Sequence, residues 1–144
     1  MPLSILLPFP VFLFLLSPSV LAQTSGAEAV FRTQIVELHA KAIGILDRIE
    51  KSVPGGVPRR ETQEEIFALV RLVHRVDEEA GATDLQYSRR GQPSSKVLLL
   101  VQQAAKGIDA MLTALDSYIE SEDRSFLGFA RDNNALVWSV RKAM

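Results

Sequence analysis

The stretch FRTQIVELHAKAIGILDRI, residues 31–49, indicates the fold of this chain. Its apolar residues are separated by steps of 4, 3, 4, 3 and 4 positions, and they are Phe31, Ile35, Leu38, Ala42, Ile45 and Ile49. An α-helix places such positions on one face, because it makes one turn in about 3.6 residues. The stretch therefore predicts an amphipathic helix over residues 27–52, whose apolar face packs against other helices.

The same spacing recurs three times in the rest of the sequence. It predicts further helices over residues 61–80, 94–120 and 124–143. The segment VPGGVP, residues 53–58, separates the first two helices, since its prolines and glycines do not continue a helix. The last turn is expected within ESEDRS, residues 120–125.

Local signals set the expected ends of the middle helices. Thr62 and Glu65 have the spacing of a capping box, in which each side chain accepts a hydrogen bond from the other residue's backbone N–H. Gly81 is expected to end the second helix, and the segment that follows it, which contains Tyr87, is expected to be a loop. Either Ser94 or Ser95 is suited to cap the third helix.

The apolar faces of these helices are wide enough to need more than one neighbour. In the second helix the predicted core positions are Ile66, Leu69, Val73, Val76 and Ala80. In the third they are Val97, Val101, Ala104, Ile108, Met111, Leu115 and Tyr118. In the fourth they are Phe126, Ala130, Asn133, Val137, Val140 and Met144, and Phe129 and Leu136 widen this face. No segment alternates with the period of two that strands require. The predicted fold class is all-α, an antiparallel (up-down-up-down) four-helix bundle.

The first 26 residues, MPLSILLPFPVFLFLLSPSVLAQTSG, contain no charged side chain. Pro8, Pro10 and Pro18 keep the uninterrupted apolar run short, and Val20-Leu21-Ala22 fits the pattern that signal peptidase cleaves. We expect a signal peptide at residues 1–22, a single mature domain at 23–144, and a secreted or periplasmic location without a stable membrane span. An uncleaved membrane anchor is the alternative.

Charge and composition narrow the classes of function. The chain has 16 basic and 17 acidic side chains, a formal net charge of −1, and no cysteine. A nearly neutral balance argues against nucleic acid as a partner. The lack of cysteine excludes disulfides, thiol nucleophiles and thiolate metal sites.

The sequence contains no catalytic motif, so we expect a protein that is not an enzyme. A carboxylate-bridged metal site in a bundle uses Glu-x-x-His, but the residues three before His39 and His74 are Val36 and Arg71. We therefore expect no metal and no cofactor. The alternative is an electron-transfer bundle with haem b, in which His39 and a methionine, Met111 or Met144, would be the ligands.

A second set of residues suggests a ligand site inside the bundle. Asn133 interrupts the apolar face of the fourth helix, and small residues lie midway along the first and third helices. Small side chains permit close helix packing, which is the usual reason for them, or a pocket. A pocket would be lined by Leu38, Ile45, Ile108, Met111 and Asn133, which suits a small apolar ligand with one polar end.

Other large apolar residues lie off the predicted core faces, and they are Phe67, Trp138, Ile43 and Tyr87. If they gather in one patch, they mark an interaction surface for a protein partner or for a second copy of the chain. The sequence as a whole predicts a non-enzymatic secreted or periplasmic binding or interaction protein. A haem bundle and a structural homo-oligomer are the alternatives.

Overall fold

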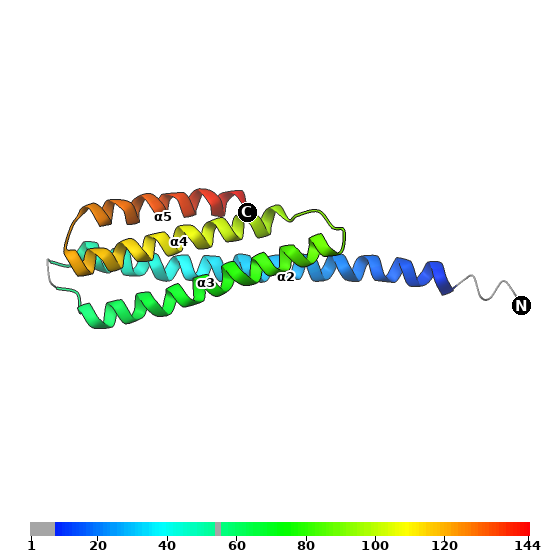
Figure 1. Ribbon diagram of the computed structural model, residues 1–144, viewed down its shortest axis with the longest axis horizontal. Coiled ribbons are helices and arrows are strands. Elements are labelled where there is room, and N and C mark those ends of the chain that lie inside the picture. The colour runs from blue at the N-terminus through cyan, green and yellow to red at the C-terminus, as the bar shows by residue number, and fades with distance from the viewer. Residues whose placement is uncertain (1–7, 54–55) are drawn as a thin grey trace, which may run out of the picture. The chain divides into compact units, whose positions relative to one another are not determined.

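The computed structural model describes residues 8–53 and 56–144, with the side chains of 26–53 and 56–144. The described residues form four helices and no strand, which confirms the all-α class (Figure 1). The helices are α2 (Pro8–Lys51), α3 (Arg59–Arg89), α4 (Lys96–Ser121) and α5 (Ser125–Ala143). The predicted signal peptide at 1–22 includes residues 1–7, which lie outside the described residues.

The chain divides into two compact units at Val30. The first unit ends at Val30, and its described part lies in α2. The second unit, Phe31–Met144, contains the rest of α2 together with α3, α4 and α5. Within it α4 packs against both α3 and α5. The core and every site described below belong to this second unit.

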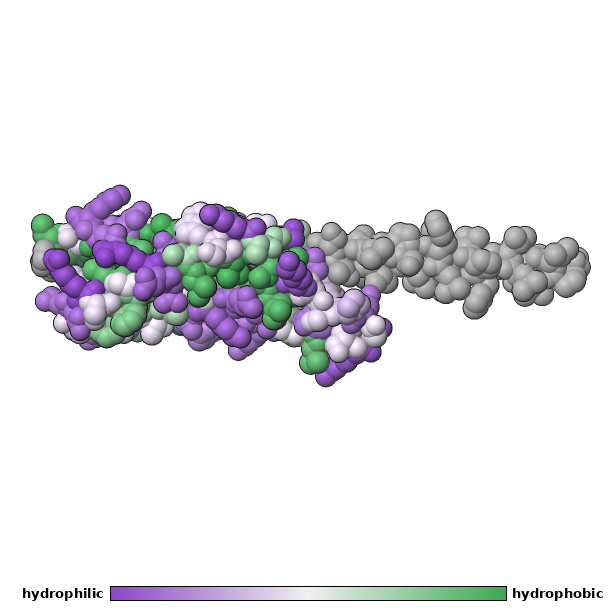
Figure 2. All heavy atoms as spheres, turned by 90° about the horizontal axis from the view of Figure 1, so that it is seen from above, coloured by the Kyte–Doolittle hydropathy of each residue, from purple (hydrophilic) through white to green (hydrophobic). Residues whose placement is uncertain are grey.

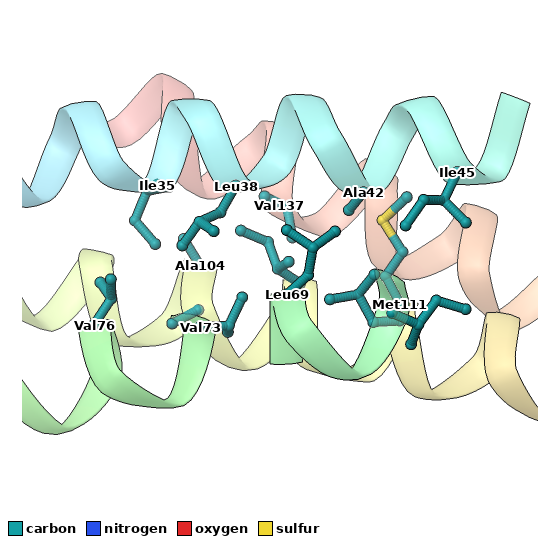
Figure 3. Packing of buried hydrophobic residues seen from close by; sticks show 14 of the residues in the cluster. Ile35, Leu38, Ala42, Ile45, Leu69, Val73, Val76, Ala104, Met111 and Val137 are labelled. Carbon is teal, nitrogen blue, oxygen red and sulfur yellow. The ribbon is translucent and has the colours of Figure 1, made fainter. Parts of the chain in front are cut away.

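The core of the second unit is built from side chains of all four helices (Figure 3). All six predicted core positions of α2 and all five of α3 are buried. In α4 the buried predicted positions are Val101, Ala104, Ile108, Met111 and Leu115. These burials confirm the helical spacing from which the faces were predicted. Removing such apolar surface from water is the main stabilising contribution to a fold without disulfides.

Gly107 is the small residue of α4 at which the structure distinguishes close helix packing from a pocket. A Cβ atom at position 107 would lie 2.6 Å from a methyl carbon of Val137 on α5. Real Cβ atoms do not approach so closely, so only glycine at position 107 permits this separation of α4 and α5. The alternative interpretation of these residues, a pocket at the same level, gains no support at Gly107.

Three predicted helix boundaries are confirmed. Ser95 is the N-cap of α4, and its hydroxyl oxygen accepts a hydrogen bond from the Leu98 N–H at 3.2 Å. The turn between α4 and α5 lies within residues 120–125, where Glu122 adopts a left-handed conformation with φ of 57°. The break at VPGGVP also lies between α2 and α3.

The predicted capping box of the second helix is wrong. Helix α3 begins at Arg59, so Thr62 lies inside the first turn and its hydroxyl donates to the Pro58 carbonyl oxygen at 2.7 Å. Glu65 instead accepts a hydrogen bond from Arg48 of α2. The helix starts earlier because Pro58 is extended and directly precedes it, a position compatible with the fixed φ of proline.

The predicted end of the second helix at Gly81 is also wrong, because α3 continues to Arg89. Tyr87 is therefore a helical residue and not a loop residue. A glycine inside a helix costs only about 1 kcal/mol. Here Gly81 lies against α4, since a Cβ atom at that position would lie 3.3 Å from the side-chain oxygen of Gln102.

The predicted face of the fourth helix is partly wrong. Ala130 and Val137 are buried as expected, but Leu127 is buried too, and Phe129 and Leu136 are exposed. Apolar residues occur on several sides of this helix, so the spacing alone does not select one face. The contacts with α2 and α4 select the side that carries Leu127, Ala130 and Val137.

Helix α4 is long and apolar enough to cross a membrane by length and composition, and it is the one such helix in the described part of the chain. Half of the apolar window is buried inside the protein. Its apolar side chains, from Leu98 to Leu115, belong to the core, so packing against α3 and α5 accounts for its composition.

Candidate functional site

The five residues of the predicted central pocket lie in two different environments. Leu38, Ile45, Ile108 and Met111 are buried members of the core. Figure 3 shows Leu38, Ile45 and Met111 pointing into the space between helices, where they pack with their neighbours. Asn133 is not buried with them. The structure therefore does not bring a polar end to this apolar group.

The prediction that Asn133 is the polar residue within the core is wrong. Its side-chain amide donates to the Phe129 carbonyl oxygen of its own helix at 2.9 Å. The adjacent residue, Asn134, has the interhelical contact instead, because its Oδ1 lies 2.6 Å from Nε2 of His39 on α2. Successive residues of a helix are rotated by about 100°, so an error of one position moves a side chain to a different face.

His39 is the centre of a polar cluster between α2 and α5, and its side chain is fully buried. Besides Asn134, it contacts Arg141, whose Nη1 lies 3.0 Å from the His39 Nδ1. Trp138 packs edge-on against the imidazole with ring centroids 5.1 Å apart. The Arg141 guanidinium lies 4.2 Å over the Trp138 ring, within the range of a cation–π interaction.

These contacts define the protonation state of His39. Arg141 is only a donor, so Nδ1 must accept, and Nε2 then carries the proton that it donates to the Asn134 oxygen. Burial lowers the pKa of His39 below its ordinary value of 6.5, and the charge of Arg141 lowers it further, while the hydrogen bond to Asn134 acts in the opposite direction. The neutral imidazole is the form that fits this cluster.

Both ring nitrogens of His39 are hydrogen-bonded, which bears on the haem alternative. An axial histidine needs one nitrogen free for iron, so ligation would require breaking the contact with Asn134 or with Arg141. The proposed second ligand could be Met111, which is fully buried in the core, or Met144, which is half-buried. No observation on these residues favours haem.

The predicted interaction surface is not brought together as one patch. Phe67 on α3 and Trp138 on α5 are exposed, at 52% and 42%. These helices both pack against α4, and they do not pack against each other. Ile43 is partly buried against the core, and Tyr87 is buried. Tyr87 was predicted to be in an exposed loop, and its burial follows from the extension of α3.

Trp138 instead helps to line a surface depression between α2 and α5. The depression has a volume of about 370 Å³, and its lining residues are Arg32, Val36, Trp138, Arg141, Lys142 and Met144. Arg32 donates to the Met144 backbone oxygen at 2.7 Å. Trp138 was expected at the surface from the sequence, but the cations beside it were not, since their proximity depends on how α2 pairs with α5.

Two smaller depressions lie elsewhere on the second unit. One is formed by α2 and α3, where the side-chain Oε1 of Gln34 is buried without a hydrogen-bond partner among the described residues. Its volume is about 190 Å³, and its charged side chains are of both signs: Glu37, Lys41, Arg75 and Glu79. The other, about 170 Å³, lies near the VPGGVP segment. Both are about half as large as the α2–α5 depression.

The described residues contain no group of three His, Asp or Glu side chains placed to hold a metal ion. The second histidine, His74, is exposed and lies 3.2 Å from Asp109 of α4. Comparison with known proteins finds no matching family model, no matching curated protein and no matching solved structure. The α2–α5 depression and its His39 cluster are therefore interpreted from their own chemistry.

Proposed function

We propose that the chain is a non-enzymatic binding protein of the secretory route, and that its ligand lies in the α2–α5 depression. The observation that carries this proposal is the exposed Trp138 beside Val36 and Met144, within a hollow of about 370 Å³. Small-molecule sites in proteins are hollows of about 300–1,000 Å³ lined by apolar side chains with a few polar groups. The depression lies at the lower end of that range, which suits a small ligand better than a folded partner.

The architecture in this proposal is an antiparallel up-down-up-down four-helix bundle. Hydrogen bonds join Arg32 to Met144, His39 to Asn134, and Glu50 to Arg131, so higher positions on α2 meet lower positions on α5. The contacts between α3 and α4 follow the same rule, since Gln63 is bonded to Asp116 and Glu120 and His74 is paired with Asp109. Opposite directions with short connections are the economical way to enclose one core.

The location in this proposal is secreted or periplasmic, after cleavage behind Ala22. The uncharged N-terminal segment and its small-residue site support cleavage. The mature protein would then be residues 23–144, with no cofactor. A protein partner or self-association remains the competing use of the exposed apolar residues, and no contact between Phe67 and Trp138 favours it.

The test is to express the full-length chain in a secreting host and to record native and denaturing mass spectra of the product. We expect a mature mass that begins at Gln23, and an additional mass that is lost on denaturation. In parallel, amphiphiles with anionic, neutral and cationic head groups are titrated while the fluorescence of Trp138 is followed, since Trp138 is the only tryptophan in the sequence.

The outcomes separate the parts of the proposal. A retained N-terminal segment contradicts the predicted cleavage. A product without bound mass, whose tryptophan emission responds to none of the amphiphiles, contradicts the binding site. A concentration-dependent oligomer that loses Trp138 exposure would instead favour self-association.

A further inference from the structure

The α2–α5 depression is rich in positive charge. Arg32, Arg141 and Lys142 line it, none of its six lining residues has an acidic side chain, and Arg32 donates to the Met144 oxygen. The ion pairs found in the described part of the chain join other residues, for example Arg48 with Glu65 and Arg131 with Glu50. Three cationic side chains line one hollow, and Arg141 and Lys142 take part in none of these ion pairs, so the hollow has a local positive potential in a protein whose net charge is only −1.

Two of these cations are already held in place. The Arg141 guanidinium is held between the His39 nitrogen and the Trp138 ring, and Arg32 is bonded to the Met144 backbone oxygen. A guanidinium has five N–H donors, so each of these side chains retains donors for a further acceptor. Orientation before binding reduces the entropy that a ligand must overcome.

The other half of the lining is apolar. Val36, Trp138 and Met144 come from the same two helices as the cations, and Val36 and Trp138 are exposed large hydrophobic residues. A cationic group beside an apolar surface is complementary to a ligand that has a negatively charged end and an apolar body. A purely polar anion would leave the apolar surface uncovered, and a neutral hydrocarbon would leave the cations unpaired.

We propose that the depression binds a small amphiphilic carboxylate, whose anionic group meets Arg141 and Lys142 and whose apolar chain lies on the three apolar side chains. This inference rests on the proposed binding function and adds the charge and class of the ligand. A carboxylate also matches the planar donor pair of a guanidinium, which can bind both oxygens at once.

The probe is decanoate, compared with decanol and decyltrimethylammonium at concentrations below their micelle formation. Each is added to the secreted full chain while Trp138 emission is recorded. We expect saturable binding of decanoate that weakens as salt is added, and affinities at least about fivefold lower for the two other probes, because they lack the ionic contact.

A pair of variants tests the cations themselves. Lys142→Gln removes one of the two positive charges that meet the ligand and should weaken decanoate binding by about threefold, with no effect on decanol. Lys106→Gln removes an exposed lysine of α4 outside the depression and should leave both affinities unchanged. Circular dichroism of each variant verifies that the helices are retained.

Equal affinities for the three probes, or a Lys142→Gln variant that binds decanoate as tightly as the original, would overturn the anionic ligand and leave the binding function intact. Binding to vesicles that contain anionic lipid, without binding of free decanoate, would overturn it in favour of a membrane surface. If no probe changes the emission of Trp138, both this inference and the proposed function fail.

Discussion

The two histidines of the chain lie in two helix contacts with different chemistry. In the α2–α5 contact, His39 is fully buried and both its nitrogens are bonded across the helices. In the α3–α4 contact, His74 is more than half exposed, and its Asp109 partner lies at the surface. Water competes more strongly for the second pair than for the first, because the His39 imidazole is buried and His74 is exposed. The comparison indicates that buried polar contacts must be complete, whereas exposed ones are optional.

The largest expected effect comes from removing each histidine in turn. His39→Ala leaves a cavity and deprives Asn134 and Arg141 of a buried partner, so we expect the free energy of unfolding to fall by about 3 kcal/mol. His74→Ala removes an exposed pair and should change it by less than about 1 kcal/mol. Urea denaturation of both variants measures the difference. Similar losses in the two variants would contradict the comparison.

The second prediction concerns the glycine that brings α4 and α5 together. Gly107→Ala would place a methyl group against Val137, and overpacking of this kind costs about 1–3 kcal/mol, offset by about 1 kcal/mol of helix propensity. We expect a net loss of about 1 kcal/mol. The matched control is Gly44→Ala, where nothing lies within 4 Å of the added atom, and a gain of up to about 1 kcal/mol is expected. Thermal unfolding monitored by circular dichroism compares the two, and two gains would mean that the α4–α5 contact is loose.

The third prediction separates the contacts by pH. The lowered pKa of His39 means that the unfolded chain takes up a proton near pH 6.5 while the folded chain does not. The free energy of unfolding should therefore be highest above pH 6.5, and it should fall as the pH is lowered toward the pKa of the folded protein. His39→Gln should remove this dependence, as measured by urea denaturation between pH 7.5 and about 5. A dependence that persists in His39→Gln must come from other groups.

The smallest effect is expected in the α3–α4 contact. Glu120 accepts hydrogen bonds from Gln63 and Arg59, and these bonds lower its pKa below the ordinary value of 4.5. The stabilisation is present above pH 4.5 and is lost as the pH falls through the lowered pKa. Because Glu120 is exposed, Arg59→Gln should change the free energy of unfolding at neutral pH by an amount close to experimental error. Added salt should abolish this small difference. A large loss of stability in Arg59→Gln that persists in high salt would show that this contact resembles the buried His39 contact.

The fold was largely predictable, because burial follows helical spacing wherever apolar residues lie on one side. The faces around Ile35, Val73 and Ile108 are of this kind. Helix α5 was less predictable, since Phe129 and Leu136 compete with Leu127 for the interior and only the neighbouring helices decide between them.

The candidate site was less predictable than the fold. His39 and Asn134 are 95 positions apart, and no local pattern indicates that they meet. The choice of Asn133 in place of Asn134 missed the partner of His39. Arg32 and Lys142 carried no signal at all, since charged residues of this kind are common on every helix surface.

The proton on the His39 Nε2 is a probe of local opening between α2 and α5. It is enclosed between α2 and α5, so it can exchange with deuterated solvent only when those helices separate locally. Its exchange rate therefore reports how readily the α2–α5 contact opens. A ligand in the neighbouring depression should slow that rate, even though it never touches the proton itself.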